Sequence, residues 1–204
     1  MRILRLTIRN LNSLRCEATI DFDEPPLSRA GIFAITGPTG AGKTTLLDAL
    51  TLALYGRTPR DSKANEIMSN GSADCLAEVE FETPAGRYRA AYARKRAHGK
   101  PDGNLQAAQR YLARYDPETG EWPYLAERLV REVDEQIESV TGLDFDRFTR
   151  SVMLTQGDFA RFLAAKATDR GDLLERITGT EIYNQISRAA FERHKLSRQE
   201  LEEG

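Results

Sequence analysis

The stretch that decides the fold reads Gly37-Pro38-Thr39-Gly40-Ala41-Gly42-Lys43-Thr44-Thr45. Glycine at positions 37 and 42, followed by lysine and threonine, matches a phosphate-binding loop at every fixed position. Glycine lets the backbone come close to a phosphate, and successive amide N–H groups can then surround the anion. The helix that begins here adds the partial positive charge of its N-terminus. The stretch therefore predicts a site for ATP and Mg²⁺.

Each residue type in this loop has an expected role. Residues 37–42 present backbone amides to the phosphates, and Lys43 reaches the β- and γ-phosphates, which makes it the expected catalytic lysine. The Thr44 hydroxyl is the expected Mg²⁺ ligand, and Thr45 is placed to contact the α-phosphate. A chance cluster of glycine, lysine and threonine would lack the flanking elements that such a loop requires.

The flanks of the loop supply those elements. The run Ile32-Phe33-Ala34-Ile35 predicts a strand buried on both faces, as in a parallel sheet covered by helices. After the loop, leucines at positions 46, 47, 50 and 54 have helical spacing, and Gly56 predicts the end of that helix.

The remaining sequence predicts an α/β fold. Residues 4–9 and 18–23 read as strands, residues 76–83 and 87–95 as a β-hairpin, and residues 109–115 as a third antiparallel strand. Apolar residues from 129 to 140 predict a helix that ends near Gly142. A short strand is expected at 151–155, with helices at 159–165 and 173–177 and a charged helical tail beyond 181. We expect a mixed sheet around the loop strand, an antiparallel β subdomain at about 76–126, one lobe over 1–180, and the start of a coiled-coil helix over 181–204.

Composition excludes several classes of protein. The 204 residues carry 29 basic and 31 acidic side chains, so a net charge of -2 gives no overall attraction to nucleic acid. Cys16 and Cys75 have no short-spaced partners, which argues against a disulfide framework and a zinc site. No apolar run approaches the ~18 residues of a membrane span, and the N-terminus lacks the apolar core of a signal peptide. A reduced, cytoplasmic protein without membrane contact is expected.

Stretches of sequence outside the phosphate-binding loop indicate which family of P-loop proteins this chain resembles. They are Asn10-Leu11-Asn12-Ser13-Leu14, Ile20-Asp21-Phe22, Cys75-Leu76-Ala77-Glu78-Val79-Glu80-Phe81, Leu143-Asp144-Phe145-Asp146-Arg147-Phe148, Leu154-Thr155-Gln156-Gly157-Asp158-Phe159 and Thr178-Gly179-Thr180-Glu181-Ile182-Tyr183. Together they resemble the N-terminal segment of the SbcC family, SMC-like ATPase subunits of bacterial SbcCD nucleases. The resemblance covers nearly the whole chain.

The resemblance implies further site residues. Gln156 matches the position where a glutamine amide contacts Mg²⁺ and senses the γ-phosphate; the alternative is an ordinary surface residue in a Gln-Gly turn. Asn12 and Ser13 match a turn near ribose and base, although a polar turn between strands needs no ligand. Contact with the DNA backbone is expected for some basic residues, and the alternative for each is a solvated surface. The candidates are Arg57, Arg60 and Lys63, with a second cluster at 94–100.

The resemblance also implies partners. The signature motif, the Walker B acidic pair and the zinc hook of the family do not occur in these 204 residues. The expected partners are therefore the C-terminal lobe of the same protein, a second head in a homodimer, an SbcD-type nuclease and double-stranded DNA. The implied function is ATP-dependent clamping of DNA ends that gates a nuclease. Two alternatives stay open: an SMC-type chromosome organiser without a nuclease, and the ATPase of a membrane transporter.

Overall fold

The computed structural model describes residues 1–59, 67–127, 130–151, 190, 191 and 193. The chain divides into two compact units, Met1–Phe145 and Asp146–Gly204. The helix α3 (Phe145–Ser151) begins at the boundary, and the first unit holds every other named element. Several expected elements lie wholly or almost wholly outside the described residues and stay predictions. They are those at 151–155, 159–165, 173–177 and 181–204, together with the domain boundary expected at 180.

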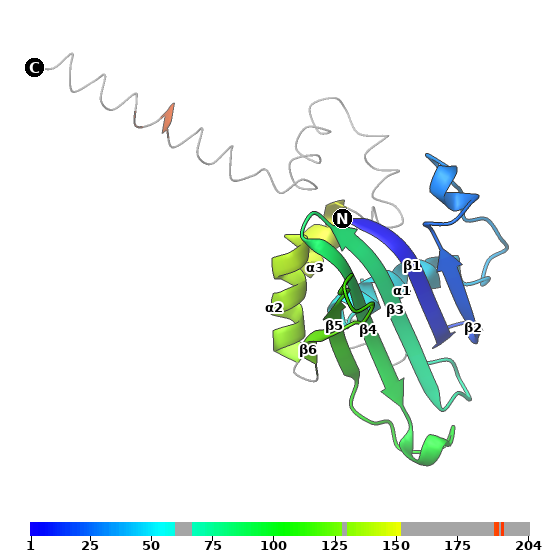
Figure 1. Cartoon of the computed structure of the whole chain (residues 1–204). Helices are drawn as coiled ribbons and strands as arrows, with labels where there is room; N and C mark the ends of the chain where they lie inside the picture. Colours follow the sequence, from blue (N-terminus) through cyan, green and yellow to red (C-terminus); the bar gives the residue numbers. More distant parts are fainter. Residues whose placement is uncertain (60–66, 128–129, 152–189, 192, 194–204) are drawn as a thin grey trace, which may run out of the picture. The chain divides into compact units, whose positions relative to one another are not determined.

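The first unit is built on a single six-stranded sheet (Figure 1). The strands follow the order β2-β1-β3-β4-β5-β6, and every neighbouring pair is antiparallel. Their bounds are β1 Arg2–Leu11, β2 Leu14–Asp21, β3 Asp74–Thr83, β4 Gly86–Lys95, β5 Gln109–Arg114 and β6 Tyr124–Glu127. The predicted hairpin and the third antiparallel strand are confirmed as β3, β4 and β5.

The α/β class is confirmed, but the sheet differs from the expected one in two respects. The run at 32–35 does not form a strand: Ile32 is 95% exposed and Phe33 47% exposed. The expectation of a mixed sheet around this strand is therefore wrong for the described residues. A central parallel strand needs partners on both edges and helices over both faces, and an apolar run cannot supply them alone. The second difference is that β3 also pairs with β1, opposing Val79 to Leu6, so the antiparallel strands expected at 76–126 are present and continue the sheet of β1 and β2.

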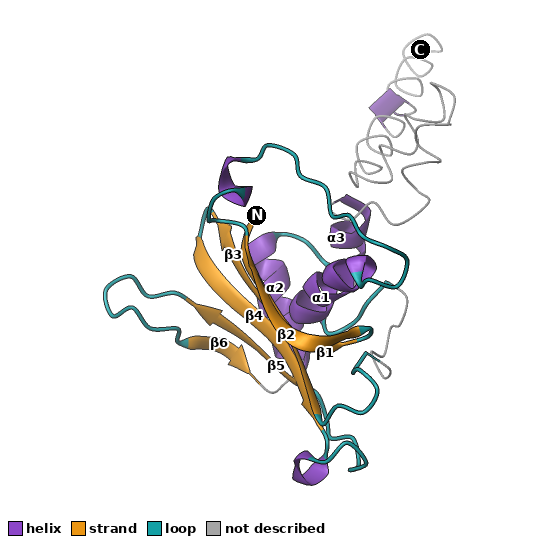
Figure 2. Ribbon diagram, turned by 90° about the vertical axis from the view of Figure 1, so that its right-hand side faces the viewer, coloured by secondary structure: helices purple, strands orange, loops and turns teal. Residues whose placement is uncertain are grey.

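One face of the sheet makes the hydrophobic core. Alternate residues of β1, β3, β4 and β5 are buried there, because side chains alternate between the faces of a strand. They include Leu6, Ile8, Val79, Phe81, Ala90 and Leu112. The helix α1 (Lys43–Tyr55) packs on β1, β3 and β4, and α2 (Val130–Thr141) packs on β5 and β6. Figure 2 shows both helices on the same face. Two short 3₁₀ turns, Leu27–Arg29 and Ala97–Gly99, lie in loops.

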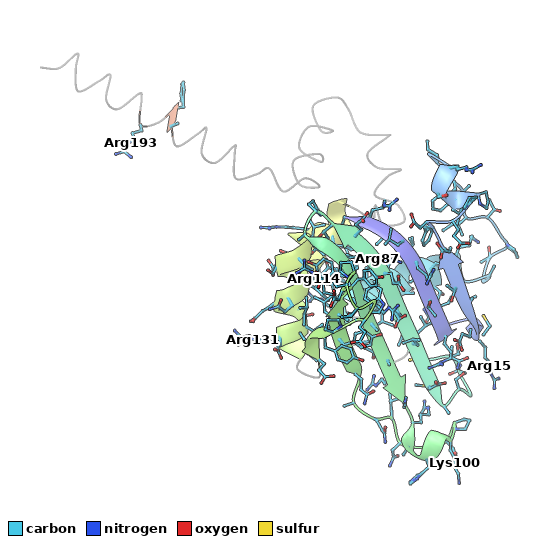
Figure 3. All side chains as sticks on the ribbon, in the orientation of Figure 1. Arg15, Arg87, Lys100, Arg114, Arg131 and Arg193 are labelled. Carbon is cyan, nitrogen blue, oxygen red and sulfur yellow. The ribbon has the colours of Figure 1, made fainter. Side chains whose placement is uncertain are left out.

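The opposite face carries a network of charges around the buried carboxylate of Glu80. Arg87 and Arg89 donate to its two oxygens at 2.7 and 2.8 Å. Burial alone would raise the pKa of Glu80, but the hydrogen bonds from these two arginines outweigh it and lower the pKa below the usual value. Trp122, from the β5–β6 connection, covers the Arg89 guanidinium at 4.1 Å. Figure 3, which labels Arg87, shows how densely side chains crowd over this region.

Candidate functional site

The phosphate-binding loop joins an unpaired segment to the start of α1. Gly42 caps the helix in the left-handed region, with φ 86°, and its carbonyl accepts the first helical hydrogen bond from Leu46 N at 3.3 Å. Gly40 is also left-handed, with φ 84°. Residues with a Cβ rarely adopt this conformation, so the sequence pattern and the observed backbone agree. The predicted helix is confirmed, and it ends at Gly56, whose N–H donates to Leu52 O at 2.8 Å.

Lys43 lies over the loop from which it emerges. Its ammonium donates to the carbonyl oxygens of Gly37 and Pro38, both at 2.8 Å. These two bonds hold the positive charge at the loop that is predicted to receive the phosphates. A lysine has three donors, so one N–H remains for a phosphate oxygen even while both carbonyl bonds persist.

The two threonines of the loop differ in exposure. Thr44, in the first turn of α1, is exposed, whereas Thr45 is 4% exposed. An exposed hydroxyl beside the loop fits a Mg²⁺ ion that keeps several waters and takes its other ligands from phosphate oxygens. Among the described residues, no group of three or more His, Cys, Asp or Glu side chains could hold a metal without such help. The roles of both threonines stay predictions.

The β1–β2 turn lies directly against the loop. A Cβ built on Gly42 would come within 2.5 Å of the Leu14 side chain, so Leu14 contacts the helix cap closely. Asn12 is left-handed, with φ 47°, and its side-chain amide approaches the carboxylate of Asp48 on α1 at 3.5 Å. Ser13 is exposed at the tip of the turn. The predicted nucleoside-side residues and the predicted phosphate loop are therefore neighbours in space.

Sequence reasoning missed two buried polar residues near this turn, Asp48 and Ser69. They are 3% and 4% exposed. A signal for Asp48 was present, since it interrupts the leucine pattern of α1 one turn after Thr44. No local signal marks Ser69, because its partners are more than fifty residues away in the sequence.

The basic candidates are only partly placed. Arg57 is exposed just beyond α1, and its guanidinium covers the Phe145 ring at 4.2 Å. It lines a cavity of about 330 Å³ with Arg94 and Arg110. The Arg110 guanidinium is already hydrogen-bonded within the protein, because it donates to the Asp134 carboxylate and to Leu54 O, both at 2.7 Å. The cavity lies at the end of α1 far from the phosphate loop.

Three predicted site residues lie outside the described part of the chain: Gln156, Arg60 and Lys63. Their roles stay predictions. Within the described ranges, no helix is both long and apolar enough to cross a membrane.

A family model described as an AAA domain matches residues 5–203. The SbcC component of the SbcCD nuclease of Pseudomonas aeruginosa is 47% identical over 212 residues, which cover 95% of this chain and 17% of that protein. The SbcC protein of Rhodobacter capsulatus is 41% identical over 222 residues, covering 98% of this chain and 17% of that protein. The chain thus spans less than a fifth of the length of these relatives.

Among solved structures, the SMC head domain from Thermotoga maritima aligns with a TM-score of 0.41 at 19% identity, over 67% of this chain and 42% of that one. This structural likeness is too weak to carry an inference. The sequence relatives, in contrast, confirm the expected resemblance to SbcC. Because the family match extends over nearly all its residues, the chain belongs to the AAA domain family.

Proposed function

We propose that the chain binds ATP with Mg²⁺ through residues 37–45 and forms part of the ATPase head of an SbcC-type protein. The observation that carries the proposal is the loop itself: left-handed glycines at its end, and Lys43 held over its carbonyls. A bound Mg²⁺ would neutralise charge on the phosphates. Lys43 would add its own charge at the β- and γ-phosphates, and the backbone amides would orient them.

The ATP site is proposed to be completed by residues beyond this chain. Ile32, Phe33 and Ile35, just before the loop, are 95%, 47% and 46% exposed, and Leu47 on α1 is 38% exposed. Exposed apolar side chains on both flanks of the loop are unfavourable in water and suit a surface that another part of the protein covers. The C-terminal lobe of the same protein is the proposed cover. A second head would then close over the γ-phosphate in a homodimer.

The wider role rests on the relatives. Two of them are named as components of a nuclease, and a third is named a probable DNA double-strand break repair Rad50 ATPase. We infer that ATP-driven dimerisation clamps double-stranded DNA ends and gates an SbcD-type nuclease partner in the cytoplasm. Gln156 would couple the γ-phosphate to dimerisation. Arg57, Arg60 and Lys63 would contact the DNA backbone, where charge rather than base sequence decides binding.

Turnover measurements test the division of labour. The 204-residue chain contains the phosphate loop but not the Walker B acidic pair of the resembled family, so we propose that the carboxylate that positions the attacking water comes from the remainder of the protein. We expect negligible ATP hydrolysis by this chain alone. Adding the remainder of the protein in trans should restore hydrolysis, with a rate that rises more than linearly with head concentration. Robust, concentration-independent hydrolysis by the chain alone would refute the proposal that it is half of an active site.

A further inference from the structure

The β1–β2 turn is held from one side by Ser69. The Ser69 hydroxyl donates to Asn12 O at 2.8 Å and lies 3.4 Å from Leu14 O. The backbone N–H of Ser69 donates to Asn10 O at 2.9 Å, and Asn12 N donates to Ile67 O at 2.8 Å. One buried serine therefore bonds to this turn region twice, through its hydroxyl to Asn12 O and through its backbone N–H to Asn10 O.

The same turn is held from the other side by α1. Asp48 accepts from the Asn12 side-chain amide at 3.5 Å, and its backbone carbonyl accepts from the Thr51 hydroxyl at 3.0 Å. Asp48 lies one helical turn beyond Thr44, so the helix that carries the phosphate loop also carries this contact. Leu14 adds an apolar contact at Gly42. The turn is thereby fixed relative to the loop.

This bracing has an energetic reason. Asn12 adopts a left-handed conformation, with φ 47°, which asparagine visits more readily than other residues with a Cβ but does not adopt exclusively, so the surrounding contacts select it here. Without its partners the turn would populate other conformations, and the apparent affinity of any ligand that needs the braced form would fall with the population of that form. The phosphate loop has its own supports in α1 and in the bonds of Lys43.

We propose that Ser69 and Asp48 are positioning residues that hold the Asn12–Ser13 turn for contact with the nucleoside part of ATP. The phosphates are held separately by residues 37–45. This inference rests on the proposed nucleotide-binding function and divides its site into two parts: a phosphate cradle that works without Ser69, and a nucleoside contact that depends on it.

A comparison of two ligands tests the division. Calorimetry on the full-length protein measures the affinity for ATP and for inorganic tripolyphosphate, each with Mg²⁺. Tripolyphosphate has the phosphates but no nucleoside. One hydrogen bond of the Ser69 kind is worth about a threefold to tenfold change in an equilibrium constant. Ser69→Ala should therefore weaken ATP binding by about threefold to tenfold and leave tripolyphosphate binding within about twofold.

Three further variants sharpen the result. Ser69→Thr keeps the hydroxyl and should restore ATP affinity, and Asp48→Ala should repeat the selective loss of ATP. Ser72→Ala is the matched control, because Ser72 is also buried in this segment, at 6% exposure, and within the described part of the chain no hydrogen bond joins its side chain to the turn. It should bind both ligands normally.

The possible outcomes distinguish the proposed nucleotide-binding function from the proposed positioning role of Ser69. If the unaltered protein binds neither ligand, the proposed nucleotide-binding function is wrong. If it binds both, while Ser69→Ala loses both equally or loses neither, the positioning role is overturned and the nucleotide site stands. A selective loss of ATP that Ser69→Thr reverses supports the positioning role.

Discussion

Adding a methyl group at Gly42 or at Gly40 perturbs the phosphate loop in two separable ways. Both glycines are left-handed, with φ 86° and 84°. An added Cβ at Gly40 meets nothing within 4 Å, whereas one at Gly42 lies 2.5 Å from Leu14 Cδ2 and 2.6 Å from its Cγ. Gly40→Ala therefore reports backbone strain alone, and Gly42→Ala reports the same strain with a steric clash.

The expected magnitudes follow from these two contributions. A left-handed residue with a Cβ costs about 1–2 kcal/mol, and overpacking a tight contact costs about 1–3 kcal/mol. Because the clash is with the end of a flexible leucine, we expect it near the lower limit. At about 1.4 kcal/mol for each factor of ten, Gly40→Ala should weaken binding of Mg²⁺·ATP about 5- to 30-fold. Gly42→Ala should weaken it about 30- to 150-fold.

Calorimetry with Mg²⁺·ATP on the full-length protein measures the loss of affinity in each variant. A double-mutant cycle then tests whether the extra loss in Gly42→Ala comes from the clash with Leu14. In a Leu14→Ala background the added methyl has room, so Gly42→Ala should cost about 1 kcal/mol less than in the native background. If Gly42→Ala costs no more than Gly40→Ala, and costs the same in both backgrounds, the Leu14 contact and the loop geometry derived from it are wrong.

Three further predictions concern other parts of the chain. Glu80 has a lowered pKa in the folded protein, so its contribution to stability is present above its unfolded pKa of about 4.3 and is lost as the pH falls through the folded value. Glu80→Gln should cost about 1–3 kcal/mol near neutral pH and flatten the acid limb of unfolding measured by thermal melts; an unchanged acid limb would contradict this. Gln156→Ala should spare ADP binding and reduce ATP-driven dimerisation measured by light scattering, whereas equal loss of ADP and ATP binding would indicate misfolding. Charge reversal of Arg57, Arg60 and Lys63 together should weaken duplex binding and flatten its salt dependence, measured by fluorescence anisotropy, with ATP binding retained; an unchanged salt slope would move the DNA contact elsewhere.

Local signals predicted most of the local structure. The loop pattern, the leucine spacing of α1 and the terminal Gly56 are contained in about twenty consecutive residues, and all three are found in the structure. The hairpin of β3 and β4 was equally readable, because its strands alternate about a short turn. Such features depend on neighbours in the sequence, which the sequence displays directly.

What escaped prediction depends on contacts between distant segments. Alternation in β1 indicates a strand but does not say that Leu6 will oppose Val79. The apolar run beginning at Ile32 indicates burial, yet burial requires a covering surface that the described residues do not provide. Ser69 looks like an ordinary loop serine until the fold brings Asn12 to it. Tertiary partners thus decided each of these outcomes.

Calorimetric titration of Mg²⁺·ATP into the full-length protein and its Lys43→Ala variant tests the central claim most directly. Removing the ammonium now bonded to Gly37 O and Pro38 O leaves phosphate charge uncompensated, which should cost about 2–5 kcal/mol. We predict that ATP affinity falls at least about tenfold, while circular dichroism shows the fold unchanged. An ATP affinity equal to that of the unaltered protein would contradict the assignment of residues 37–45 as the nucleotide site.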